Sequence, residues 1–162
     1  MPWSPAKAVG VAIGLLLLTG CSGPELACTM IAAPSGVGVT VAKDIAAEVT
    51  SVRLTVCHNG DCQDHAIELS PGSISVDQGC SGTDPDSACS ATAVPDGTKA
   101  GFADVPGLPV GPITISATLT RSNKRTLLKA VEVTSKTVYP NGPRCGGEGN
   151  QARVTISADG LH

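Results

Sequence analysis

Cysteine content constrains this chain more than any other feature. Seven cysteines lie among 162 residues, and all but one of them fall between positions 28 and 145. An even number of cysteines in an exported domain predicts disulfide bonds, because an oxidising compartment lets them form and persist. Six cysteines allow fifteen connectivities, so the sequence around each cysteine must favour one of them.

The N-terminal segment predicts export. A single lysine, Lys7, precedes an apolar run over residues 8–18, which is too short to span a bilayer and suits the core of a secretory signal. The segment then reads Leu-Thr-Gly-Cys at positions 18–21, which resembles the lipobox of bacterial lipoproteins. The resemblance implies that residues 1–20 are removed and that Cys21 is acylated. The alternative is an ordinary signal peptide with a cysteine near its end.

Acylation of Cys21 would hold the protein at a membrane, since each buried CH₂ contributes about 0.8 kcal/mol and two or more chains anchor stably. The predicted location is the extracytoplasmic face of the cell membrane, with the lipid on Cys21 as the contact to the cytoplasmic membrane. Residues 21–27 then form a short lipidated tether, and residues 28–162 form one domain. Residues 22–27 reach roughly 25 Å when fully extended, so the domain is expected to lie near the bilayer.

The first disulfide is predicted from a turn. Asn59-Gly60 is typical of a type I′ hairpin turn, because both central residues of that turn have positive φ. With this turn, Cys57 faces Cys62 at a non-hydrogen-bonded position, where the Cα separation suits a disulfide. The hairpin register also places Arg53 opposite Ala66 on the solvent face.

The remaining cysteines form two further predicted pairs. Cys80 and Cys89 bracket a polar loop, which favours a bond between them. Cys28 is then left to pair with Cys145 and ties the start of the domain to its end. A zinc site is the competing interpretation, but the cysteine spacings differ from the usual C-x-x-C pairs.

Short stretches of β-branched residues between Gly and Pro predict an all-β fold. Alternation is clear in two of these stretches, which place Val52, Leu54 and Val56, and then Ile113 and Ile115, on inward faces. The expected strands are 36–41, 49–57, 62–69, 101–105, 113–120, 127–133 and 152–157, with one helical turn possible over 42–48. About seven short strands predict an antiparallel β-sandwich, with Phe102 as the one large ring of its interior.

Four segments together resemble a group of small actinobacterial lipoproteins of unknown function. The segments are residues 28–36, 57–62, 101–109 and 139–145. Residues 101–106 and the strand after them are also similar to the hairpin of prealbumin-like and carboxypeptidase-regulatory-like β-sandwiches. The resemblance implies an Ig-like or prealbumin-like sandwich, linked by disulfides, that serves as a structural or binding unit. No catalytic residue carries over from either group.

Catalytic and metal-binding candidates are few. The sequence contains no Gly-x-Ser-x-Gly, His-Glu-x-x-His or phosphate-binding loop motif. His58 and His65 are interpreted as structural, and no cofactor is predicted. Carboxylates near the Cys80–Cys89 loop could supply oxygen ligands to Ca²⁺, but they lack the calcium-loop pattern and are interpreted as a solvated loop. These weak candidates are Asp77, Asp84 and Asp86, with Asp96 close by in the sequence.

Charge and aromatic content narrow the possible partners. Loss of Lys7 with the signal leaves ten basic against 14 acidic residues, a net charge of −4, which argues against nucleic acid. Only Phe102 and Tyr139 remain as aromatics, too few for a sugar-stacking platform. A small basic group at a predicted turn is interpreted as solvated, with lipid headgroups as the alternative contact. Its members are Arg121, Lys124, Arg125 and Lys129.

The sequence therefore predicts a non-catalytic binding or accessory module that contacts another protein of the cell envelope. Two alternatives remain open at this stage. One is an envelope hydrolase with an unrecognised site, and the other is a carrier with an apolar cavity for a small ligand.

Overall fold

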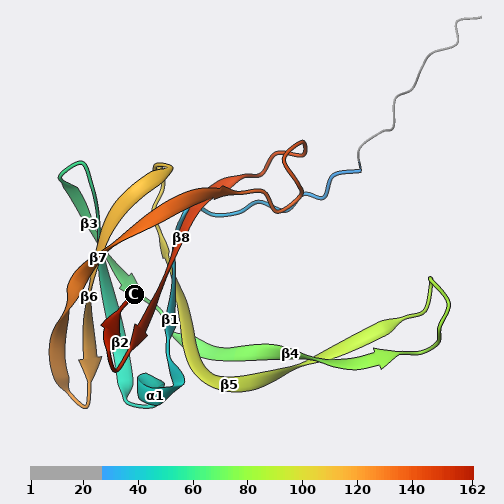
Figure 1. Cartoon of the computed structure of the whole chain (residues 1–162), viewed down its shortest axis with the longest axis horizontal. Helices are drawn as coiled ribbons and strands as arrows, with labels where there is room; N and C mark the ends of the chain where they lie inside the picture. The colour runs from blue at the N-terminus through green and yellow to red at the C-terminus, as the bar shows by residue number, and fades with distance from the viewer. Residues whose placement is uncertain (1–26) are drawn as a thin grey trace, which may run out of the picture.

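Nine strands and one short helix follow one another along residues 27–162, the part of the chain that this computed structural model describes (Figure 1). The predicted signal and Cys21 lie outside these residues. No helix in the described part is long and apolar enough to cross a membrane. The elements are β1 (Gly36–Val41), α1 (Lys43–Ala46), β2 (Val49–His58), β3 (Asp61–Ile67), β4 (Ser70–Cys80), β5 (Cys89–Asp104), β6 (Gly111–Arg121), β7 (Lys124–Val138), β8 (Gly149–Ser157) and β9 (Gly160–Leu161).

All nine strands belong to one hydrogen-bonded sheet with the order β3-β2-β6-β7-β8-β1-β5-β4, and β9 pairs with β8. Strand β7 joins the two halves, because its residues 124–135 take part in the pairing with β6 and its last three residues pair with β8. Strands β1 and β8 run parallel, whereas the other neighbours are antiparallel.

The predicted all-β class is confirmed, but the predicted strand count and the uniformly antiparallel pairing are wrong. The parallel pair joins segments more than a hundred residues apart in the chain, so no hairpin turn signals it. Strands β4 and β9 were not predicted. Neither of them presents a run of buried side chains to the core: β9 has two residues, and only Gly72 of β4 is buried.

The core lies between the inward faces of the two halves of the sheet. Alternation along β2 and β6 buries the side chains that the sequence predicts to face inward, including Leu54 and Ile115, both 0% exposed. Strands β1 and β8 contribute residues to the same apolar cluster. Those residues are Val37, Val39, Val41, Ala152, Val154 and Ile156. The core is therefore built from small and medium aliphatic side chains.

Phe102 does not belong to this core, which corrects the expectation that it is interior. Its side chain is 37% exposed, whereas the next residue in β5, Ala103, is 2% exposed. Alternation thus gives the inward position to Ala103. The Phe102 ring instead lies over Gly36 of β1, where an added Cβ would come within 2.6 Å of a ring carbon.

Strands β4 and β5 continue beyond the body of the domain as a two-stranded arm, here defined as residues 72–98 (Figure 1). Strand β5 is 16 residues long, but only Lys99–Asp104 pairs with β1. Residues 89–98 have β4 as their only neighbouring strand. At about 3.3 Å per residue, those ten residues extend roughly 30 Å.

Candidate functional site

Three disulfide bonds join the pairs expected from the sequence. Cys57–Cys62 closes the β2–β3 hairpin with a Cα–Cα distance of 4.1 Å, and Asn59 and Gly60 at its turn have φ of 50° and 91°. Cys80–Cys89 closes the tip of the arm with a Cα–Cα distance of 3.9 Å. The third bond, Cys28–Cys145, lies outside the sheet and fixes the start of the described chain.

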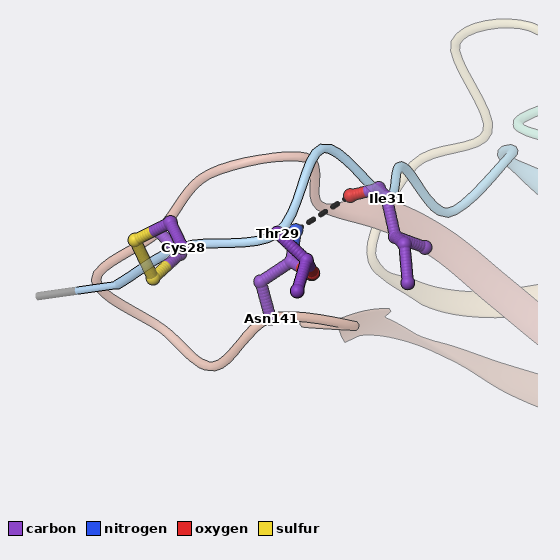
Figure 2. The surroundings of a disulfide bond; sticks show 5 residues. Cys28, Thr29, Ile31 and Asn141 are labelled. Carbon is purple, nitrogen blue, oxygen red and sulfur yellow. Dashed lines mark hydrogen bonds between the residues drawn. A yellow bond between two sulfur atoms is a disulfide. The ribbon is translucent and has the colours of Figure 1, made fainter.

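The N-terminal segment, residues 28–35, is held along its length against the loop between β7 and β8. Cys28 is bonded to Cys145 with a Cα–Cα distance of 5.4 Å. Next to this bond, the Asn141 Nδ2 donates to the carbonyl of Ile31 at 2.6 Å, and the Thr29 hydroxyl donates to the Asn141 side-chain oxygen (Figure 2). One asparagine therefore bonds two residues of the N-terminal segment.

Further contacts bring the N-terminal segment to the body. The Ala33 N–H donates to the Gly147 carbonyl at 2.8 Å, and the Val105 N–H donates to the Ser35 carbonyl at 2.9 Å. A Cβ at Gly149 would collide with the Ala33 carbonyl oxygen, so the close approach depends on glycine there. Sequence reasoning predicted the disulfide but missed these contacts, and the glycines at 146, 147 and 149 are their only sequence signal.

The arm exposes apolar side chains on one face. Ile74 is 54% exposed and Val94 is 41% exposed, and the two lie directly opposite each other across the strand pair. Val76, the next residue on that face of β4, is 37% exposed. Because these side chains remain exposed, they bury little apolar surface within the arm and contribute little to its stability. Isolated two-stranded hairpins are in any case only marginally stable in water.

The arm also has open edges and a single sign of charge. Residues 70–98 contain no lysine or arginine, while four aspartates lie between positions 77 and 96. Strand β4 ends the sheet order, and residues 73–76 along its edge are Ser-Ile-Ser-Val, without the charge or proline that commonly protects an edge strand. The arm is therefore a template for pairing with another strand.

The calcium candidates do not form a site. Asp77 Oδ1 accepts the Gly79 N–H at 2.7 Å, and Asp96 accepts both the hydroxyl and the N–H of Thr98, which lowers the pKa of the Asp96 carboxyl. Asp84 and Asp86 lie in the exposed tip loop. Within residues 27–162, no three His, Cys, Asp or Glu side chains are placed together to hold a metal ion.

The two internal histidines lie apart. His58 Nδ1 is 3.3 Å from the Pro112 carbonyl oxygen, and its Nε2 is 2.9 Å from Asn59. His65 pairs with Leu54, four residues from His58 along β2, which is roughly 13 Å of strand. They do not form one site. His58 and Asp61 instead face each other across the hairpin, beside a depression of about 170 Å³ lined mainly by apolar and proline residues.

His65 offers a test of packing. Its Nε2 is buried and has no hydrogen-bond partner among the described residues. Because a buried polar atom without a partner loses the hydration it has in the unfolded chain, His65→Leu is expected to raise the free energy of unfolding by about 1 kcal/mol, measured by urea denaturation. Gln63→Leu, at an exposed position two residues away on β3, is the control and should have a smaller effect. A less stable His65→Leu protein would contradict this account.

One residue of the predicted basic turn, Arg121, forms an ion pair with the body of the domain. Arg121 Nε donates to Glu48 Oε2 at 2.6 Å, and this contact lowers the pKa of Glu48 and raises that of Arg121. Ser122 and Asn123 form the tight turn with φ of 47° and 63°. Arg125, in contrast, lies at the start of β7 and points to a depression on the outer face of the sheet.

No family model, curated protein or solved structure matches this chain. Its function must therefore be inferred from the residues themselves.

Proposed function

We propose that this protein is a lipid-anchored, non-catalytic binding module of the cell envelope, held at the extracytoplasmic face of the membrane by acyl chains on Cys21. The arm is the observation that carries the proposal. It projects from the body, exposes Ile74 and Val94 on one face, and leaves its strand edges unpaired. Such a surface is suited to binding a partner by strand addition.

The proposed partner is another envelope protein that supplies an extended, basic segment. Main-chain hydrogen bonds to the open edge of β4 would provide affinity, and alternate apolar side chains of the segment would cover Ile74 and Val76. Lysine or arginine in the segment would complement the arm, which carries four aspartates and no basic residue. Charge thus selects this partner over a second copy of the acidic arm.

The N-terminal segment supports the anchored arrangement. Residues 28–35 are fixed to the body by the Cys28–Cys145 bond and by Asn141, so the proposed tether comprises only residues 22–27. The proposal includes the finer expectation of an Ig-like or prealbumin-like sandwich. In its support, β2 and β6 share one buried cluster with β1 and β8.

A hydrolase is the second candidate function, and the depression beside His58 and Asp61 is the observation that favours it. The side chains around it include Val56, Gln63 and Leu108, but no serine, threonine, cysteine or lysine. A hydrolase there would have water or the Asp61 carboxylate as its nucleophile. The binding module is therefore the better supported of the two.

Site-specific photocrosslinking tests the arm. A photoreactive amino acid at Val76 in the full-length protein, activated in native membranes, is expected to give one discrete crosslinked product. Mass spectrometry should place the crosslink in an extended segment of net positive charge. The same amino acid at Val110, which is 60% exposed and lies outside the arm, is the control and should give no such product.

A substitution makes this test specific. Ile74→Asp, introduced beside the probe at Val76, is expected to reduce crosslinking about tenfold or more, because the interface would bury an unpaired carboxylate. Ser75→Asp adds the same charge on the opposite face of the arm and should reduce it less. Equal yields from Val76 and Val110, or a crosslink to an acidic segment, would contradict the proposed partner.

A further inference from the structure

A depression of about 320 Å³ lies on the outer face of the sheet where β2, β6 and β7 meet. Two arginines, Arg53 and Arg125, line it together with the hydroxyl-bearing residues Ser51, Thr118 and Thr120. Nothing in the arm or in the N-terminal segment contributes to it. The depression is thus separate from the binding surface proposed above.

Strand register explains why the two arginines share this depression. Arg53 of β2 lies opposite Thr118 of β6, and Arg125 of β7 lies opposite Thr120 of β6. Thr118 and Thr120 are two residues apart and therefore lie on the same face of β6. The arginines approach from either side of this central strand, and the threonines form the floor between them.

Neither arginine is neutralised by a carboxylate. Within residues 27–162, one arginine, Arg121, has a side-chain nitrogen within 4.0 Å of a carboxylate oxygen, that of Glu48. Neither Arg53 nor Arg125 forms such an ion pair. Asp64 and Glu68 flank Ala66, which faces Arg53 across β2 and β3, and the Asp64 carboxylate accepts the Thr55 hydroxyl at 2.6 Å. The guanidinium groups therefore keep their donors free for a ligand.

We propose that this depression binds a phosphate ester. Guanidinium groups present planar pairs of donors that match two oxygens of a phosphate, and two such groups can hold one anion from both sides. The hydroxyls of Ser51, Thr118 and Thr120 can donate to the remaining oxygens. Lysine ammonium groups would also attract an anion, but they would not present paired donors in a fixed geometry as the two guanidinium groups do.

The position of the depression indicates the source of the phosphate. Arg125 is near the start of β7, whereas the loop bonded to Cys28 follows the end of that strand. From Arg125 to the last residue of β7 is 13 positions, or up to about 43 Å along the strand. With Cys21 as the anchor, which is the one element taken from the proposed function, the depression lies at the end of β7 remote from the anchored loop. The ligand is then a soluble or wall-bound phosphate ester and not a lipid headgroup.

Titration of the full-length protein in detergent tests the site. The probes are glycerol 3-phosphate and inorganic phosphate, followed by the Nε–Hε resonances of the arginines. Saturable shifts are expected for the wild type, and Arg53→Gln with Arg125→Gln should weaken binding about tenfold or more, because two charge-assisted contacts are lost. The matched control is Lys129→Gln with Arg144→Gln, which removes the same charge elsewhere and should leave binding unchanged.

Three results would overturn the proposal. The first is that neither probe binds saturably, and the second is that both variant pairs weaken binding equally. The third is that a Cys21→Ala protein binds phosphatidylglycerol vesicles and that adding Arg53→Gln and Arg125→Gln to it abolishes this binding. The last result would assign the arginines to a headgroup. None of these measurements involves Val76 or a protein partner, so failure here is distinguishable from failure of the arm.

Discussion

Replacing Cys28 and Cys145 together by alanine is expected to lower the free energy of unfolding by about 5 kcal/mol. The bond closes a loop with a sequence separation of 117 residues, and in the chain-entropy model a longer loop restricts the unfolded chain more. Since whole domains have a stability of only about 5–15 kcal/mol, the variant should approach the limit of folding. Urea denaturation of the non-reduced proteins measures the difference.

A matched pair provides the control. Cys57→Ala with Cys62→Ala removes a bond whose cysteines are only five positions apart, for which the same model gives about 2 kcal/mol. Double substitution avoids a free thiol in both variants. If the two pairs lost equal stability, restriction of the unfolded chain would not be the main contribution of the Cys28–Cys145 bond, and the contacts of the N-terminal segment would have to account for it.

Substitution of Cys21 by alanine is expected to move nearly all of the protein from the membrane to the soluble fraction. The acyl chains are the proposed attachment, and a single protein-bound fatty chain already contributes about 0.8 kcal/mol for each buried CH₂. Among the described residues, no helix could replace them as a membrane span. Cell fractionation measures the distribution, and mass spectrometry of the wild type should show the added acyl mass.

Ser22→Ala is the control for this experiment, because it alters the tether without removing the acceptor thiol. It should leave the protein in the membrane fraction. Retention of the Cys21→Ala protein in the membrane would contradict the lipid anchor. The location of the protein would then have to depend on a partner or on the signal segment.

The accuracy of the sequence predictions follows the position of each strand relative to the core. Residues over the core obey alternation, which is why the inward faces of β2 and β6 were predicted residue by residue. Strand β4 was missed because its conformation depends on pairing with β5 and on the Cys80–Cys89 bond, not on burial. Phe102 was misplaced because the alternation expected over residues 101–105 turned it inward, whereas β5 turns Ala103 inward and Phe102 outward.

The candidate sites were predictable only in part. The outward position of Arg53 and its register with Ala66 follow from the Asn59-Gly60 turn, and the structure confirms them. The approach of Arg125 depends on the order of β2, β6 and β7 in the sheet, which links residues about seventy positions apart. The contacts of Asn141 with the N-terminal segment join side chain to main chain and leave no periodic pattern in the sequence.

The attachment of the N-terminal segment also determines how mechanical force would enter the domain. A pull on a lipid at Cys21 would reach the sheet through the covalent bond between Cys28 and Cys145, and therefore at the loop after β7, the strand that joins both halves. The hydrogen bonds of Ile31 and Ala33 would carry little of that load. After reduction of the disulfide, the force would act on these hydrogen bonds one after another. Detachment of residues 28–35 would then add roughly 25 Å to the chain between the lipid and the domain. With the lipid on Cys21, this disulfide would thus set both the length of chain between the lipid and the domain and the point at which tension enters the domain.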